Sequence, residues 1–225
     1  MRVHVAFTPQ EAAPAPLAIV VDVLRATSTI AQALAAGYGR VLCCAAIDDA
    51  RDLRSQIPDS LVGGERNAVQ IDGFDVGASP REFLEPRAET LILSTTNGTR
   101  ATLEAAQRSE EVLLGSLLNL DAVARAAQGQ DTVIVCAGFQ GGFALDDAYC
   151  AGRIVELLGG ERTDAAVAAA LVAQAFSTPL DGLNARTYGP AGLEEDIAFC
   201  ARESVLDVVP RLVGMVGPAA EIALA

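Results

Sequence analysis

The sequence contains no Lys and only one His, at position 4. Without Lys, the chain can use neither Schiff-base chemistry nor the phosphate-binding lysine of Walker-type motifs. With one imidazole we expect no catalytic triad, no phosphohistidine chemistry and no His-rich metal site. We expect His4, in the alternating VHVAF, to be structural or at the surface. Any catalysis must therefore use Asp, Glu, Arg, Ser, Thr or Asn.

Paired cysteines and long hydrophobic runs are also missing. The opening MRVHVAFTPQ has no signal-type apolar region, and no apolar run is long enough to cross a bilayer. The cysteines are odd in number and have no CxxC spacing, which favours buried reduced thiols over disulfides or a zinc site; they are Cys43, Cys44, Cys136, Cys150 and Cys200. We therefore expect a soluble cytoplasmic protein with no membrane partner.

Positive charge is scarce, since the formal net charge is -13 and all sixteen basic residues are Arg. Such an acidic chain would repel nucleic acid, so no nucleic-acid partner is expected and any positive patch must be local. Of the 225 residues, 51% are hydrophobic and only 4% aromatic, which suits an α/β protein with buried parallel strands. We expect one unit spanning residues 1–225, and leave open a subdivision near residues 110–160.

The main pattern present is a repeated strand, polar loop and helix. It occurs at APLAIVVDVL, RVLCCA, ETLILST, EEVLLGSL and DTVIVCAG, and LVGGE is a further short strand. Consecutive units of this kind predict an α/β fold with a mainly parallel sheet and helices on both faces. After Thr163 the pattern is mostly helical, so we expect a C-terminal helical segment with amphipathic helices at 163–176 and 194–213.

Polar clusters follow several of these strands and should meet at one edge of the sheet, where such folds bind ligands. In LSTTNGTR, hydroxyl groups, Gly98 and Arg100 stand where a strand passes into a helix. The unpaired N–H groups of that helix, with Arg100, could form a cradle for phosphate or sulfonate. The alternative is ordinary capping of the helix by Thr or Asn.

The segment DVLRATST repeats this device, with Arg25, Thr27 and Ser28 after a strand that ends in Asp22. An Asp in an apolar strand is costly to bury unless it binds a cation or a strong donor. The alternative is a structural ion pair between Asp22 and Arg25.

Further acidic residues could complete a metal site. Glu65 follows LVGG beside Arg66, and Asp146 and Asp147 open a helix after GFQGG. Such oxygen ligands suit Mg²⁺, although acids are also common in the first turn of ordinary helices. No GxGxxG or GxxxxGK[ST] motif occurs, so a nucleotide-binding Rossmann enzyme is disfavoured.

Five ordered blocks carry a family resemblance: VVDVLRATSTI, GERNAVQIDGFDVGASP, LSTTNGTRA, GSLLN and VCAGFQGGFALDDAYCAGRIV. They resemble the ComB family, the magnesium-dependent 2-phosphosulfolactate phosphatases, closely over roughly residues 17–160 and loosely in the C-terminal helices. The resemblance implies an α/β phosphoric monoester hydrolase that uses Mg²⁺ to convert 2-phosphosulfolactate into 3-sulfolactate and phosphate. Whether the host uses this step in coenzyme M biosynthesis is not given by the sequence.

The resemblance also implies roles for particular residues. Its implied metal ligands are Asp22, Glu65, Asp146 and Asp147, and its implied catalytic residues are Asp22, Arg25 and Arg100. Its implied substrate-binding residues, for the phosphate and a second anionic group, are Thr27, Ser28, Arg66, Thr96, Asn97, Gly98 and Thr99. Asp22 could be the nucleophile or a metal ligand. Leu24 breaks the DxDx[TV] signature of aspartyl-phosphate phosphatases, which favours attack by a metal-activated water.

The chain departs from the family pattern at a few positions. Ala78 stands where members usually carry Asn, Asp146 where they carry Glu, and Ala68 where Gly is more frequent. Asp for Glu would preserve a metal role, whereas Ala78 lacks a donor that could touch the substrate. Alternatives are therefore a hydrolase of a related phosphorylated carboxylic acid and a non-catalytic protein that binds small anions. The apolar C-terminal helices would suit a homodimer interface.

Overall fold

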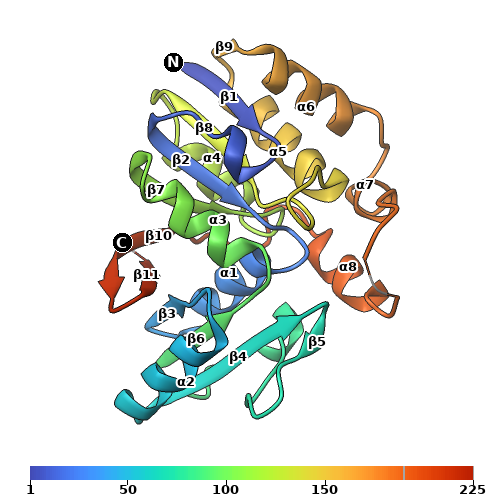
Figure 1. The fold of residues 1–225 in the computed structure, drawn as a ribbon. Coiled ribbons are helices and arrows are strands. Elements are labelled where there is room, and N and C mark those ends of the chain that lie inside the picture. The colour runs from blue at the N-terminus through green and yellow to red at the C-terminus, as the bar shows by residue number, and fades with distance from the viewer. Residues whose placement is uncertain (190, 225) are drawn as a thin grey trace.

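The structure has a single mixed β-sheet with helices on both faces (Figure 1). The computed structural model describes residues 1–189 and 191–224. The strands are β1 (Arg2–Ala6), β2 (Ala15–Val21), β3 (Arg40–Cys43), β4 (Ser60–Arg66), β5 (Val69–Gln70), β6 (Thr90–Ser94), β7 (Ser109–Gly115), β8 (Thr132–Cys136), β9 (Glu161–Arg162), β10 (Pro210–Val216) and β11 (Ala219–Leu224). The α-helices are α1 (Ala26–Ala36), α2 (Ile47–Gln56), α3 (Gly98–Ala105), α4 (Leu120–Ala126), α5 (Leu145–Leu158), α6 (Asp164–Gln174), α7 (Pro179–Asn184) and α8 (Glu194–Cys200); η1 (Pro9–Glu11) and η2 (Pro80–Glu82) are 3-10 helices.

The sheet consists of two parallel blocks joined by an antiparallel hairpin. Its strand order is β5-β4-β6-β3-β11-β10-β7-β2-β8-β1-β9. The strands β4, β6 and β3 pair in parallel, as do β7, β2, β8, β1 and β9, whereas β10 and β11 pair antiparallel with each other and with their neighbours. The mainly parallel sheet is thus confirmed, while the expected single unit over residues 1–225, with a possible subdivision near residues 110–160, is untested and stays a prediction.

The C-terminal segment differs from the expected long helix. Helix α8 ends at Cys200, and residues 210–224 form the hairpin of β10 and β11. Pro210 cannot continue a helix, and Gly217, with φ of 57°, opens a two-residue turn with Pro218. The apolar run VVPRLVGMV fits both periodicities over so short a length, so pattern alone misassigns it. The hairpin covers the edges of β3 and β7, which would otherwise be unpaired.

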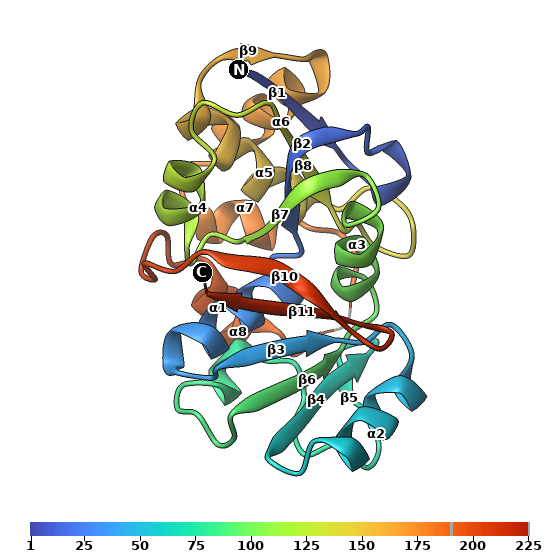
Figure 2. The ribbon, with the colours of Figure 1, turned by 90° about the vertical axis from the view of Figure 1, so that its left-hand side faces the viewer.

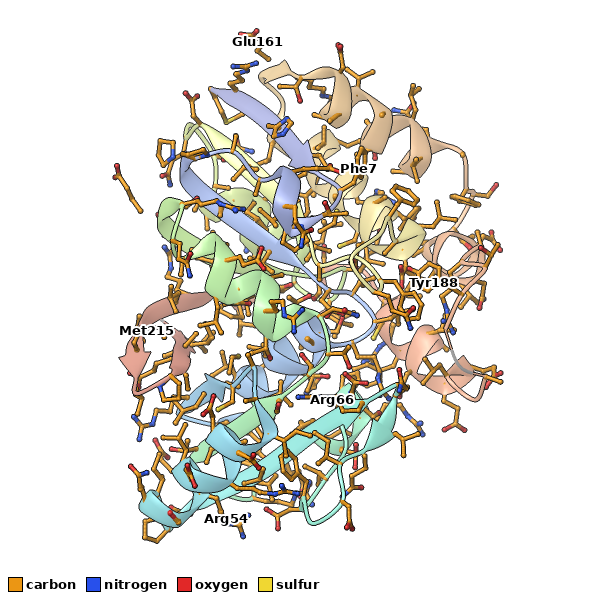
Figure 3. All side chains as sticks on the ribbon, viewed as in Figure 1. Phe7, Arg54, Arg66, Glu161, Tyr188 and Met215 are labelled. Carbon is orange, nitrogen blue, oxygen red and sulfur yellow. The ribbon has the colours of Figure 1, made fainter. Side chains whose placement is uncertain are left out.

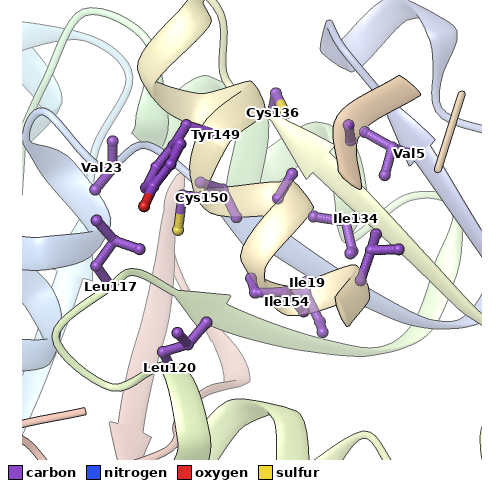
Figure 4. Packing of buried hydrophobic residues seen from close by; sticks show 14 of the residues in the cluster. Val5, Ile19, Val23, Leu117, Leu120, Ile134, Cys136, Tyr149, Cys150 and Ile154 are labelled. Carbon is purple, nitrogen blue, oxygen red and sulfur yellow. The ribbon is translucent and has the colours of Figure 1, made fainter. Parts of the chain in front are cut away.

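Helices cover both faces of the sheet, as expected. Figure 2 shows α1 and α4 on one face and α2 and α3 on the other. The largest core cluster joins β1, β2, β7 and β8 to α4, α5 and α6, with Ile19, Ile134, Tyr149 and Ile154 buried at its centre (Figure 4). Residues Leu17–Val21 of β2 are fully buried, which explains why this strand reads as a continuous apolar run.

The carboxyl ends of the central strands lie on the side of the molecule that carries α7 and α8 (Figure 1). There β2 leads into α1 and β6 leads into α3, while β8 leads through a glycine loop into α5. Because parallel strands deliver their following loops to one edge, this arrangement brings the polar clusters of the sequence together. Helix α1 ends at Gly37, whose left-handed φ of 110° is typical of a glycine C-cap.

All five cysteines are free and buried, as expected. Burial raises the pKa of the Cys43 thiol and of the Cys44 thiol, the latter to about 12, so these groups stay protonated at neutral pH. His4 lies in β1 with its Nδ1 2.9 Å from Oγ1 of Thr163, in keeping with a structural role. Within the described part of the chain, every helix is too short or too polar to traverse a bilayer.

Candidate functional site

A cavity of about 270 Å³ lies beyond the carboxyl ends of β2, β4 and β6. One wall comes from the residues that follow these strands, and the opposite wall comes from the loop between α7 and α8. Of the residues expected at the site, the lining includes Asp22, Arg25, Glu65, Thr96, Asn97 and Asp146. The cavity is therefore a common meeting place for four of the predicted polar clusters.

Asp22 follows β2 directly and is only 7% exposed. Its Oδ1 accepts a hydrogen bond of 3.3 Å from the Ala26 N–H at the start of α1. A Cβ at Gly98 would lie 2.6 Å from Oδ2 of Asp22 and 2.4 Å from the Cβ of Ala26, so only glycine permits this close approach. Gly98 therefore leaves the room that Asp22 and Ala26 occupy.

The surroundings of Asp22 disfavour the ionised form of its carboxyl group. Burial raises its pKa to about 7, the Ala26 N–H opposes the rise, and the charges of Asp146 and Glu65 add to it. No ion pair with an arginine offsets this charge among residues 1–189 and 191–224. A bound cation would favour the ionised form.

Asp146 stands in the first turn of α5 and is also buried in the cavity wall. Burial raises the pKa of its carboxyl, while the Tyr188 phenol donates a hydrogen bond to Oδ1 and opposes the rise. Tyr188 in turn stacks on Phe139, with ring centroids 4.5 Å apart. Tyr188 follows α7 in the chain (labelled in Figure 3), so its hydrogen bond to Asp146 joins the loop after α7 to the start of α5.

Asp147 does not line the cavity, so its expected place among the metal ligands stays a prediction that the lining does not support. Its Oδ1 accepts a 3.0 Å bond from the Val23 N–H, and its Oδ2 accepts a 3.0 Å bond from the Gly138 N–H. Burial and the charges of Asp146 and Asp22 hold its pKa well above the usual range. Asp147 thus fastens the end of β2 to the loop after β8, beneath the cavity.

Glu65, in β4, lines the cavity as expected, and its carboxylate is already well bonded. Its Oε1 accepts bonds from the N–H and Oγ1 of Thr96, at 2.8 and 2.9 Å, and its Oε2 accepts one of 2.7 Å from the Ala68 N–H. Glu65 therefore connects the turn between β4 and β5 to the segment before α3.

Arg25 lines the cavity but pairs with a residue that the sequence did not indicate. Its Nη1 lies 2.7 Å from Oδ2 of Asp196 in α8, and its Nη2 donates to the Ala68 carbonyl at 3.3 Å. The alternative of an Asp22–Arg25 pair is therefore wrong. The Oδ1 of Asp196 accepts a further bond of 2.6 Å from the Ser79 hydroxyl, so Asp196 holds three segments together at the rim.

Three of the expected substrate-binding hydroxyls are used internally instead. The Thr27 hydroxyl donates to the Asp22 carbonyl at 2.9 Å, and the Ser28 hydroxyl donates to the Val23 carbonyl at 2.8 Å. The Thr99 hydroxyl lies 3.1 Å from that of Thr95. All three are buried away from the cavity lining, and their hydroxyls form hydrogen bonds within the first turns of α1 and α3 and the segments just before them.

Two expected arginines also lie outside the lining. Arg66 donates to the carbonyls of Glu65, Ala45 and Ser94, so its guanidinium fastens strand ends together (Figure 3). Arg100 is exposed on α3 and is not among the lining residues. Its catalytic role stays a prediction without a contact in this structure to support it.

The sequence reasoning missed the wall formed by the loop between α7 and α8. Arg186, Tyr188, Gly189 and Leu193 line the cavity from this side. No function was expected for the segment between the helices predicted at 163–176 and 194–213. The signal in the sequence was the grouping of Arg, Tyr and Gly in NARTYGP. Loops that connect helices often carry binding residues, and Arg and Tyr can both bind a ligand.

The carboxylates in the cavity fit a magnesium ion that is held by few protein ligands. In the described ranges no group of three or more His, Cys, Asp and Glu side chains is placed to hold a metal by itself. Asp22 and Asp146 nevertheless supply two buried carboxylates in one cavity, and neither forms an ion pair there. Magnesium commonly takes one or two carboxylates and completes its shell with water and substrate phosphate.

Comparisons with known proteins point in one direction. A family model described as 2-phosphosulpholactate phosphatase matches residues 4–214. A protein of Gloeobacter violaceus named probable 2-phosphosulfolactate phosphatase is 41% identical over 226 residues, covering 94% of this chain and 95% of that protein. Proteins with the same name from Caldanaerobacter subterraneus and Thermus thermophilus are 39% and 37% identical, and the alignments cover 86% and 97% of this chain and 86% and 98% of theirs.

Proposed function

The chain belongs to the 2-phosphosulpholactate phosphatase family, and we propose that its cavity hydrolyses 2-phosphosulfolactate to 3-sulfolactate and phosphate with the help of Mg²⁺. Membership makes it a phosphoric monoester hydrolase. The observation that supports the assignment of the cavity is the meeting of two buried carboxylates, Asp22 and Asp146, with arginines in about 270 Å³. That volume lies just below the range of about 300–1,000 Å³ for drug-sized ligands and suits a three-carbon acid.

Asp22 and Asp146 would hold the magnesium ion, with Glu65 beside them. When bound, Mg²⁺ would neutralise phosphoryl oxygens and lower the pKa of a bound water. Burial raises the pKa of both carboxyls, because it disfavours their ionised forms. A bound cation would stabilise the ionised form of each carboxylate. Asp147 is left out of this set because, unlike Glu65, it does not line the cavity.

The chain's own residues would bind and align the phosphate. Arg25, held by Asp196 and the Ala68 carbonyl, would orient the phosphate through its remaining N–H donors in the wall of the cavity. Asn97 adds an amide at the same edge, immediately before α3. Phosphoryl transfer needs mainly alignment and charge neutralisation. The fixed guanidinium of Arg25 would supply alignment without reorganisation during the reaction, and bound Mg²⁺ would supply most of the neutralisation.

The attacking group in this proposal is water rather than Asp22. Aspartyl-phosphate phosphatases place an acid two residues after the nucleophile, but here that position is Leu24, whose apolar side chain lines the cavity. No carboxyl is then available there to protonate the leaving alkoxide. A directly attacking Asp22 would lack that partner, so we assign Asp22 to the metal.

A second candidate substrate class is supported by Ala78. This residue lines the cavity and is 1% exposed, and it replaces the Asn of the usual family pattern. Loss of an amide donor next to the ligand weakens recognition of one oxyanion, so a phosphorylated carboxylic acid such as 2-phospholactate is the alternative.

The proposal also includes the location and the assembly of the protein. The buried free thiols support a cytoplasmic location. The exposed apolar side chains of Val167 and Leu171 on α6 support a homodimer.

The test is phosphate release from 2-phosphosulfolactate and from 2-phospholactate, before and after EDTA and after return of Mg²⁺. We expect turnover of 2-phosphosulfolactate to stop with EDTA and to recover with Mg²⁺. Full activity in EDTA would remove the metal from the proposal. Tight binding of 2-phosphosulfolactate without phosphate release would instead indicate the anion-binding alternative.

A further inference from the structure

The cavity contains two kinds of arginine, and the difference between them concerns how the substrate is recognised. This reasoning rests on the proposed function. 2-Phosphosulfolactate carries a sulfonate and a carboxylate in addition to the phosphate that is removed. An acidic protein with net charge -13 must supply local cations for all these groups. Within the described part of the chain, the basic side chains that line the cavity are Arg25 and Arg186.

The charge of Arg25 is already balanced. Its Nη1 lies 2.7 Å from Oδ2 of Asp196, and the two side chains are 9% and 7% exposed. A buried pair of this kind presents little net charge to a ligand. Arg25 can orient a phosphate through its remaining donors, but its field is largely cancelled by Asp196.

The charge of Arg186 is not balanced in this way. Over residues 1–189 and 191–224 the guanidinium forms no ion pair, and its recorded hydrogen bond is one of 2.7 Å to the Tyr188 carbonyl. This bond fixes the guanidinium against its own loop, yet it consumes only one of five N–H donors. The remaining donors belong to a half-buried side chain in the cavity wall.

The backbone of the loop is shaped around this guanidinium. A Cβ at Gly189 would lie 2.4 Å from Nη1 of Arg186, and Gly189 has a φ of 92° that other residues rarely adopt. Glycine at this position therefore permits the arginine to lie flat against the chain. The loop thus holds Arg186 in one place instead of leaving it to move in solvent.

Arg186 also lies close to the reacting end of the cavity. Burial raises the pKa of both Asp146 and Tyr188, and the charge of Arg186 opposes this rise at each group. The Tyr188 phenol donates directly to Asp146. The spacing between a cation on this loop and the carboxylates is thus fixed by one hydrogen bond and by the stacking of Tyr188 on Phe139.

We propose that Arg186 is a specificity-determining residue, which binds an acidic group of the substrate that is not transferred, its sulfonate or its carboxylate. The planar fork of arginine matches the oxygen pairs of such groups and can bind two of them at once. Arg25, together with the magnesium ion held by Asp22 and Asp146, would then bind the phosphoryl group. The enzyme in this way divides one multiply charged substrate between two walls.

The test compares Arg186→Ala with wild type and with Arg202→Ala, using the Mg²⁺-loaded protein. Arg202 is a matched control because it is exposed near α8 and does not line the cavity. In titration calorimetry, we expect Arg186→Ala to weaken binding of 3-sulfolactate by about 10- to 100-fold, the range of a lost charge-assisted hydrogen bond. Binding of inorganic phosphate should change less than about 3-fold, and Arg202→Ala should change neither.

Kinetics supply a second readout. Arg186→Ala should raise KM for 2-phosphosulfolactate far more than it lowers kcat, and Arg186→Lys should recover part of the loss because it retains the charge without the fork. Titration of the same variants with lactate and with a simple alkyl sulfonate identifies which of the two groups is bound. Unchanged affinity for 3-sulfolactate, or equal weakening for 3-sulfolactate and phosphate, would overturn the proposal.

These outcomes separate the inference from the function on which it rests. If wild type released no phosphate from 2-phosphosulfolactate, the proposed function would fail, while the 3-sulfolactate titration would still report on Arg186. If wild type were active and Arg186→Ala bound 3-sulfolactate normally, only the assignment of Arg186 would fail. A melting temperature within a few degrees of wild type confirms that each variant is folded.

Discussion

The two walls of the cavity are built in different ways. The strand-edge wall, formed by residues after β2, β4 and β6, relies on short contacts along the chain, such as Asp22 with Ala26 and Glu65 with Ala68, four and three residues apart. The outer wall, formed by Arg186, Tyr188, Gly189 and Leu193, is joined to it by contacts between distant segments. Arg25 and Asp196 are 171 residues apart, and Asp146 and Tyr188 are 42 apart.

The difference shows how a rigid metal site and a recognition surface can be combined. Asp22 is held by the N–H groups at helix starts, which exist as soon as the strand and helix form. Arg186 and Tyr188 have their positions only after α7 and α8 have packed beside the sheet. The position of Asp22 in the strand-edge wall is therefore set by local structure, whereas the outer wall depends on docking of the C-terminal half.

The largest effect should come from breaking the junction between the walls. In Asp196→Ala, Arg25 would remain buried without a partner, and the free energy of unfolding should fall by about 3–5 kcal/mol. The KM for 2-phosphosulfolactate should rise because Arg25 would no longer be fixed. Urea unfolding and steady-state kinetics would measure the two changes.

The neighbouring residue supplies a control. Glu195 is 76% exposed and pairs with Arg81 at the surface, so Glu195→Ala should change stability by less than about 1 kcal/mol. If both substitutions had equally small effects, the junction would not hold the walls together.

The next effect tests the strand-edge wall. Asp22→Asn should lower kcat/KM by about 10²–10³-fold, the range for loss of one group that stabilises developing charge. Asp48→Asn, at an 87% exposed position in α2, should leave activity unchanged. Near-normal turnover in Asp22→Asn would remove this carboxylate from the metal site.

The same variant should alter how stability depends on pH. Burial raises the pKa of Asp22 from 3.8 to about 7, so the folded protein binds more protons than the unfolded chain between these values. Stability of the metal-free protein should therefore fall as pH rises from about 4 to about 7. Asp22→Asn should make this decline shallower, and unfolding in EDTA at several pH values would measure it. Identical slopes for the two proteins would contradict the assigned cause.

The smallest effect concerns the turn between β4 and β5. Asn67 and Ala68 have φ of 54° and 62° in a two-residue turn, where the second position favours glycine. Ala68→Gly should raise the free energy of unfolding by about 0.5–1 kcal/mol by relieving the left-handed backbone. The same substitution in a helix, Ala168→Gly in α6, should lower it by about 1 kcal/mol. Thermal unfolding would measure both, and equal signs would refute the argument.

The sequence predicted the strand-edge wall well for a physical reason. A polar residue at the end of an apolar strand, such as Asp22 or Glu65, stands out because its burial requires compensation. Sequence reasoning could not separate Asp146 from Asp147, because adjacent carboxylates in one helical turn differ only in direction. The structure places Asp146 in the cavity and bonds Asp147 to Val23 and Gly138 beneath it.

Hydroxyls and arginines were predicted less well. Thr27, Ser28 and Thr99 occur where an anion cradle would need them, but short polar side chains also bond to nearby groups of their own segment, and these three do so. Arg66 was assigned to the substrate because it adjoins Glu65, whereas its long side chain reaches the carbonyls of neighbouring strands. A flexible side chain reveals its partner only in three dimensions.

By itself, the amino-acid sequence determined the α/β class, the parallel strands and the acidic residues after them, because burial and helix initiation are local constraints. Tertiary structure alone decided the place of the hairpin of β10 and β11, the pairing of Arg25 with Asp196, and the presence of Arg186 and Tyr188 in the cavity. These features depend on segments far apart in the chain, whose meeting is specified by the packing of the whole molecule and not by any single stretch.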